Sequence, residues 1–230
     1  MALRLEELGA ERQRIQISPS GANPALFHGS QPCQSPPLLL AVGRFVAKKG
    51  PLLTLRAFQL CLQRADVSPL PQLWMVGEGP LLAEARRFVV QHQLQNNVVF
   101  AGVCSQEQVA ERMRQVRAFV QHSIVAPDGD SEGSPVAVME AQLSGLPVIA
   151  TRHAGIPDVV LDGATGLLVE EGDVDAMAQA MLTLLAEPML AQKLGEAGQR
   201  RALQHFTVEH HLRDVTELLL RVSSAARALS

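Results

Sequence analysis

The chain repeats one pattern along its length: a short apolar run ends at a glycine or a polar residue, and a helix-like segment commonly follows. Apolar runs of this kind, bounded by turn signals, are typical of strands buried on both faces of a sheet. Alternation of such strands with helices indicates βαβ units around a parallel sheet. The expected strands are 38–42, 73–76, 98–101, 118–121, 148–151 and 166–169. The sequence therefore predicts an α/β fold.

Helical patterns occupy the segments between and after these strands. The expected helices are 51–65, 80–93, 106–115, 136–144 and 174–187, followed by 188–205 and 208–227. Thr207 is the expected N-cap of the last one, because its hydroxyl can accept a hydrogen bond from a free amide of the first turn. Before residue 37, a segment rich in proline and glycine is typical of a linker that enters the domain from elsewhere.

Composition narrows the function classes. The 230 residues are 47% apolar, enough for a sizeable core, and the formal net charge of -3 gives no overall field to attract nucleic acid or anionic lipid. Three cysteines with no metal-ligand spacing suit reduced thiols. Neither a signal peptide nor a run of about 18 apolar residues is present. We therefore expect no membrane span, no nucleic-acid partner and a cytoplasmic location, with peripheral attachment to the inner face of the membrane left open.

The most informative stretch is 130–140, where two glutamates, Glu132 and Glu140, lie eight positions apart around a predicted helix start. Ser134 is a favourable N-cap and Pro135 a favourable first helical residue. The amides of the next residues, beginning with Val136, would then point outward at the positive end of the helix dipole, which is a ready site for an anion. A capped helix with two solvated glutamates is the structural alternative for this stretch taken alone.

These residues resemble the E-x7-E element of family-4 retaining glycosyltransferases of the GT-B fold. Further segments are similar to that family's motifs in the same order, over about residues 15–215: Val42-Gly43-Arg44 with Lys48-Lys49-Gly50, Val76-Gly77-Glu78-Gly79-Pro80, Phe100-Ala101-Gly102-Val103, the run 141–151 and the run 163–169. The runs 126–133 and 151–157 look most like the exopolysaccharide branch of the colanic acid and amylovoran type.

The resemblance implies a role for each site residue. Arg44 and Lys49 would bind the donor diphosphate, Glu140 the ribose hydroxyls and Glu132 the transferred sugar, so that Glu132, Arg44 and Lys49 are the candidate catalytic residues. The remaining residues expected to bind the donor are Gly43, Gly77, Val103, Cys104, Gly133, Ser134, Pro135 and Val136, with the base near Val103 and Cys104.

No metal and no cofactor are expected, because the nucleotide-sugar is a substrate and its diphosphate would meet cations of the protein. Asp128 and Asp130 have the spacing of a metal clamp but precede the loop of Glu132, so we assign them no metal role. His153 is interpreted as a loop or packing residue.

The resemblance also implies a division of the chain. Residues 1–36 would be a remnant of an acceptor domain with the interdomain linker, 37–205 the nucleotide-sugar-binding Rossmann-like domain, and 206–230 a C-terminal helix. The chain would be the C-terminal, donor-binding half of a hexosyltransferase that moves a hexose from UDP- or GDP-hexose to a saccharide or lipid-linked acceptor in polysaccharide biosynthesis, and it would be inactive alone. A fragment, a misplaced start and one half of a two-chain enzyme all fit this expectation.

Three other functions are compatible with parts of the sequence. A dinucleotide-dependent oxidoreductase is suggested by Gly77 and Gly79 after a strand, but Leu82 stands where the third glycine belongs. A non-catalytic nucleotide-sugar-binding module acting with a partner chain remains open. So does a sugar-nucleotide epimerase, which would release a new sugar nucleotide without any acceptor.

Overall fold

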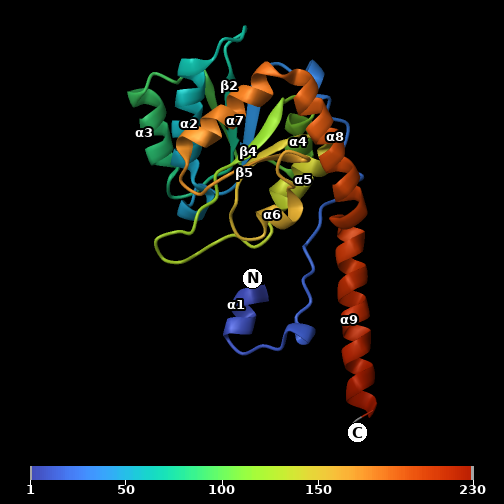
Figure 1. The fold of residues 1–230 in the computed structure, drawn as a ribbon. Coiled ribbons are helices and arrows are strands. Elements are labelled where there is room, and N and C mark those ends of the chain that lie inside the picture. The colour runs from blue at the N-terminus through green and yellow to red at the C-terminus, as the bar shows by residue number, and fades with distance from the viewer. Residues whose placement is uncertain (1, 229–230) are drawn as a thin grey trace.

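Six parallel strands form one sheet in the computed structural model, which describes residues 2–228 (Figure 1). The strands are β1 (Leu38–Val42), β2 (Gln72–Val76), β3 (Val98–Gly102), β4 (Ala118–Gln121), β5 (Val148–Thr151) and β6 (Gly166–Val169). Their order is β3-β2-β1-β4-β5-β6, and every neighbouring pair is parallel. All six expected strands are confirmed, with ends that differ by at most one residue.

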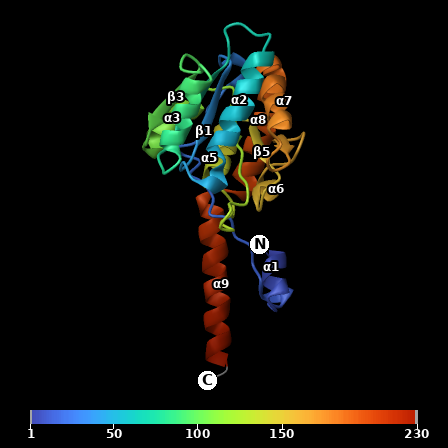
Figure 2. The ribbon, with the colours of Figure 1, turned by 90° about the vertical axis from the view of Figure 1, so that its left-hand side faces the viewer.

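Helices cover both faces of this sheet. They are α2 (Pro51–Arg64), α3 (Leu82–Gln91), α4 (Gln106–Met113), α5 (Val136–Ser144), α6 (Ile156–Val159), α7 (Val174–Ala186) and α8 (Pro188–His205), with the short 3₁₀ helices η2 (Pro32–Gln34) and η3 (Ala47–Lys49). Figures 1 and 2 show α2, α3 and α7 on one face and α4, α5 and α8 toward the other. The Rossmann-like α/β architecture expected from the sequence is therefore confirmed.

Two hydrophobic cores result, one on each face. In β1, Leu39 packs into the core beneath α2, α3 and α7, whereas Leu38 and Leu40 pack into the core beneath α4, α5 and α6. Successive side chains of a strand point to opposite faces, so a strand that is covered on both sides needs an uninterrupted apolar run. This requirement explains why the strands could be predicted from continuous apolar runs in the sequence.

Two terminal segments extend away from the sheet on the same side of the molecule (Figures 1 and 2). One contains α1 (Ala2–Glu7) and η1 (Arg12–Arg14), and the other is the long helix α9 (Val208–Ala228). Thr207 precedes α9, and its hydroxyl oxygen accepts a hydrogen bond from the N–H of His210 at 3.4 Å, as expected of an N-cap. None of the helices within residues 2–228 combines the length and the apolar character required to cross a bilayer.

A candidate donor-binding site at the switch point of the sheet

The strand order places a crevice between β1 and β4. Connections from β1 run toward one edge of the sheet and those from β4 toward the other, and ligands of doubly wound folds bind outside the carboxyl ends of the strands at this point. β1 is followed directly by Gly43 and Arg44, and β4 is followed by the loop 122–135, which carries Glu132. The sheet topology thus brings two of the expected site segments together at the carboxyl ends of two neighbouring strands.

Lys49 and Glu132 meet in this crevice. The ammonium Nζ of Lys49 lies 3.2 Å from the carboxylate Oε2 of Glu132 across 83 positions of sequence. Both side chains are largely withdrawn from water, with 17% and 8% of their surfaces exposed. Burial lowers the pKa of Lys49 below its ordinary value, although the charge and hydrogen bond of Glu132 act in the opposite direction. The other oxygen of Glu132, Oε1, is buried without a hydrogen-bond partner among residues 2–228, so it can accept a bond from a ligand.

The neighbouring lysine holds the same loop. Nζ of Lys48 lies 3.0 Å from Oδ1 of Asp130 and 3.3 Å from the carbonyl oxygen of Ser131. Asp128 accepts a hydrogen bond from the N–H of Asp130 instead of facing it across a cation. Within residues 2–228, no group of three or more histidine, cysteine, aspartate or glutamate side chains is arranged to hold a metal ion.

α5 (Val136–Ser144) has the expected bounds, but the N-cap expected at Ser134 is wrong by one residue. Pro135 keeps an extended backbone and occupies the N-cap position of α5, and no side chain caps the helix. The carbonyl of Gly133 accepts a hydrogen bond from the N–H of Gly155, which fixes this segment against the loop after β5. The extended Pro135 therefore lies outside the helix. The first helical bond runs from the N–H of Val138 to Pro135, so the preceding amides remain available, as an anion site requires.

Glu140 lies in the second turn of α5 and is 8% exposed. Burial raises the pKa of its carboxyl group to about 7. The side chain is therefore a buried acid that is partly protonated at neutral pH, which allows it either to donate or to accept hydrogen bonds with a hydroxyl group.

The expected glycines have an evident packing role. Gly43 donates its N–H to the carbonyl of Val76 at 3.0 Å, and a Cβ atom on Gly77 would overlap the carbonyl oxygen of Gly43. Gly77 has φ of 130°, in the region that favours glycine. Val103 and Cys104 follow β3 at the edge of the sheet; Val103 is 70% exposed and Cys104 is half-buried. They therefore lie two strands away from β1, at the same end of the sheet.

Two cavities are lined by other residues of the expected site. A small cavity of about 30 Å³ is lined by residues that include Gly43, Arg44, Lys49 and Gln121. A larger one of about 540 Å³ lies between residues 131–134, the loop 153–155 and the N-terminal segment 15–20. Glu132 lines the larger cavity, and Arg44 is exposed beside the smaller one. The site thus has cations on one side and Glu132 on the other.

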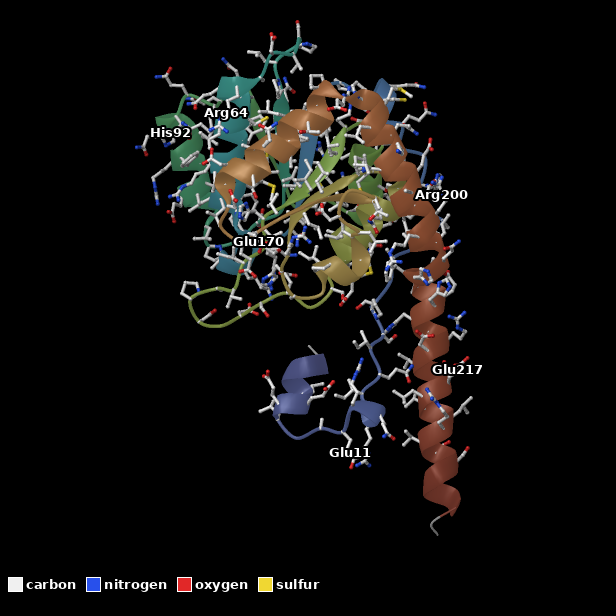
Figure 3. The ribbon with its side chains drawn as sticks, viewed as in Figure 1. Glu11, Arg64, His92, Glu170, Arg200 and Glu217 are labelled. Atoms are coloured by element: carbon white, nitrogen blue, oxygen red, sulfur yellow. The ribbon has the colours of Figure 1, made fainter. Side chains whose placement is uncertain are left out.

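His153 and Glu171 belong to the site, although sequence reasoning interpreted His153 as a loop or packing residue and did not select Glu171. His153 is 1% exposed, and its Nε2 accepts the N–H of Glu132 at 3.0 Å. Its Nδ1 lies 2.6 Å from Oε1 of Glu171. Glu170, labelled in Figure 3, precedes Glu171 after β6 and forms an ion pair with Arg152 at the same end of the sheet. Separations of 18 and 21 positions carry no local signal that could have revealed these contacts.

A doubly wound sheet with two buried glutamates and a helix N-terminus at its switch point defines a class: the Rossmann-like half of a GT-B fold. The chain belongs to the family described as glycosyl transferases group 1, which matches residues 26–201. The resemblance to glycosyltransferases that the sequence motifs indicated is thereby confirmed.

Similar proteins include relatives from the branch expected from the sequence. The chain is 33% identical over 181 residues to WcaL of Escherichia coli (strain K12), a candidate colanic acid biosynthesis glycosyltransferase, covering 77% of this chain and 44% of the relative. It is 28% identical over 222 residues to the amylovoran biosynthesis glycosyltransferase AmsK of Erwinia amylovora, covering 96% and 54%. The structure of Anabaena Alr3699/HepE in complex with UDP-glucose shares the fold, with a TM-score of 0.82 at 19% identity, covering 96% of this chain and 61% of that one. The chain spans about half the length of the curated relatives it matches.

Proposed function

We propose that this chain is the donor-binding half of a retaining glycosyltransferase, which takes a hexose from UDP- or GDP-hexose to a saccharide or lipid-linked acceptor in exopolysaccharide biosynthesis. The observation that carries the proposal is the meeting of Lys49 and Glu132 at the switch point, next to a helix N-terminus with free amides. A cation beside free amides suits a diphosphate, and a buried carboxylate with an unpartnered oxygen suits a sugar hydroxyl.

In this proposal the diphosphate lies between the cations that follow β1 and the start of α5. Arg44 and Lys49 bind phosphate oxygens, and Gly133, Ser134, Pro135 and Val136 line the opposite side with their backbone. Gly43 and Gly77 allow the chain to approach the donor closely. The base lies toward Val103 and Cys104.

The two glutamates divide the sugars between them. Glu140 binds the ribose hydroxyls from within α5, and Glu132 binds the hydroxyls of the transferred hexose. A cation on the departing diphosphate stabilises the charge that develops there as the glycosidic bond breaks, which is the main electrostatic contribution expected of such a site. The chain's own cations would supply this charge without a metal.

The test is calorimetric titration of the purified chain with UDP and with GDP, each in the presence of EDTA. We expect binding that persists under chelation and weakens as salt is added. The variant Arg64→Ala should bind nucleotide as the wild type does, because Arg64 pairs with Asp175 on the surface of the sheet domain. It is therefore the control for any variant that removes an arginine from the proposed site. Failure of both nucleotides to bind, or binding that requires added magnesium or manganese, would contradict the proposal.

We further propose that the 230-residue polypeptide by itself binds the donor but does not transfer sugar. Catalysis of this kind depends on holding donor and acceptor together, and well-oriented reactants gain about 7 to 11 kcal/mol from positioning. Incubation with radiolabelled UDP- and GDP-sugars and a membrane extract stripped of transferases tests this, with an acceptor domain from a related enzyme added in a parallel sample. Transfer by the polypeptide alone would overturn it.

A further inference from the structure

The loop 122–135, which carries Glu132, is anchored by a chain of hydrogen bonds that runs from a buried contact at Glu132 to the exposed side chain of Glu171, and the proposed reaction does not use these contacts directly. His153, on the loop after β5, accepts the backbone N–H of Glu132 through Nε2 at 3.0 Å. Glu171, after β6, lies 2.6 Å from the other ring nitrogen of His153. Through its second carboxylate oxygen, Glu171 also accepts the N–H of Val125 at 2.9 Å. One carboxylate therefore reaches both ends of the loop.

These contacts define the protonation of the imidazole ring. A backbone N–H can only donate, so Nε2 of His153 must be the bare acceptor nitrogen. In the neutral ring the proton then resides on Nδ1 and is donated to Glu171. If the proton moved to Nε2, two donors would face each other at Glu132 and the anchor would be lost.

Glu171 is suited to fix this tautomer. Its side chain is one-third exposed, and the partial burial acts to raise the pKa of its carboxyl group. The hydrogen bonds from His153 and from the N–H of Val125 outweigh that effect and hold the pKa below its ordinary value. The carboxylate is therefore ionised at neutral pH and can only accept.

The hydrogen bond from Glu132 to His153 fixes the residue that we propose to bind the transferred sugar. The backbone N–H of Glu132 is fixed by His153, and one carboxylate oxygen contacts Lys49. The other oxygen is buried and has no hydrogen-bond partner in the described part of the chain. We propose that His153 and Glu171 are positioning residues that hold the backbone of Glu132 so that its carboxylate meets the sugar of the bound donor. This inference rests on the proposed function, because it assumes that Glu132 contacts the transferred sugar.

A matched pair of variants separates positioning from packing. In His153→Gln, the side-chain amide reaches the place of Nε2 and its oxygen can still accept the N–H of Glu132. In His153→Asn, the amide reaches only the place of Nδ1, so the contact with Glu171 can persist while the N–H of Glu132 loses its acceptor. The two variants differ by one methylene group, and thermal unfolding is the check that each of them is folded.

The first measurement needs no ligand. Amide hydrogen exchange of Glu132 should be about tenfold faster or more in His153→Asn than in the wild type, because a buried hydrogen bond is lost, and should remain slow in His153→Gln. Nitrogen NMR of the imidazole should show the proton on Nδ1 in the wild type and a loss of that tautomer in Glu171→Gln. A wild-type ring protonated on Nε2, or equal exchange in both His153 variants, would overturn the proposal.

The second measurement compares each nucleotide with its sugar, UDP with UDP-glucose and GDP with GDP-mannose. We expect His153→Asn to bind bare UDP or GDP within about twofold of the wild type and to lose about fivefold to tenfold in affinity for the nucleotide-sugar, with recovery in His153→Gln. Equal losses for both ligands, or equal losses in both variants, would reduce His153 to a packing residue. If the wild type binds no nucleotide, the proposed function fails, and amide exchange and the tautomer still decide the anchor.

Discussion

Nζ of Lys49 lies 3.2 Å from Oε2 of Glu132, so the cation expected to bind the diphosphate is paired with the carboxylate expected to bind the sugar. A phosphate oxygen that binds Lys49 would share the ammonium group with Glu132, whose negative charge repels it. The pair therefore couples two parts of the donor site, and this coupling gives the first prediction.

Glu132→Gln should strengthen the binding of bare UDP or GDP and remove the extra affinity contributed by the sugar. The amide carries no charge to repel the diphosphate or to neutralise Lys49, and the gain should be roughly 1 kcal/mol, the upper end for a pair that keeps some contact with water. Calorimetry with nucleotide and nucleotide-sugar in parallel measures both effects. Asp130→Asn is the matched control, because Asp130 pairs with Lys48 rather than Lys49. Weaker binding of bare nucleotide would contradict this electrostatic effect.

Arg44→Ala should weaken nucleotide binding by about 1.5 to 3 kcal/mol, the usual worth of a hydrogen bond to a charged group. Arg44 is exposed and forms no ion pair with another residue of the stretch 2–228, so its loss should leave the unfolding temperature nearly unchanged. Titration and thermal unfolding of the same sample separate the two properties. A variant with normal affinity would remove Arg44 from the phosphate site.

Glu140→Gln should change how stability depends on pH. Burial raises the pKa of Glu140 to about 7 in the folded chain, so between the unfolded pKa near 4.5 and pH 7 the folded state binds more protons than the unfolded state. The free energy of unfolding contributed by this group is therefore highest below that window and falls as pH rises through it, by about 3 kcal/mol in total.

Glutamine resembles the protonated acid and does not titrate, so the variant should match the wild type near pH 4, below the window, and exceed it near pH 8. Denaturant unfolding of both proteins across this range is the measurement. Glu84→Gln, on the exposed first turn of α3, is the control for replacing a helical glutamate that is not buried. Parallel pH profiles for Glu140→Gln and the wild type would show that Glu140 is ionised in the folded chain.

Gly155→Ala should displace the loop of Glu132. A Cβ atom at this position would lie 2.5 Å from the carbonyl oxygen of Gly133 and 2.9 Å from Oγ of Ser134. Overpacking of this kind costs about 1 to 3 kcal/mol of stability, and the shifted loop should also weaken nucleotide-sugar binding. Gly198→Ala adds the same methyl group within α8, where the nearest atom is 3.3 Å away, and should be tolerated far better. Equal behaviour of the two variants would mean that the loop adapts without cost.

Most strands and helices of the fold could be predicted from the sequence. The strand 38–42 appeared as an apolar run because helices cover both faces of the sheet, so neither Leu38 nor Leu39 could be polar. The N-cap of α5 was harder to predict, although its bounds agree: Ser134 carries a good local signal for the N-cap, but the bond from Gly155 to Gly133 accompanies an extended Pro135, which takes that position instead. A partner 22 positions away cannot be read from local preference.

The sequence by itself determined the order of strands and helices, the motifs around Arg44, Lys49, Glu132 and Glu140, and through them the family. Each of these depends on side chains that are close along the chain, where periodicity and spacing act. Only the tertiary structure decided that Lys49 pairs with Glu132, that His153 and Glu171 anchor the same residue, and that Glu140 is buried deeply enough for its pKa to approach neutrality. Those properties arise where separate strand ends converge at one edge of the sheet and exclude water, so they depend on distances in space that no spacing in the sequence specifies.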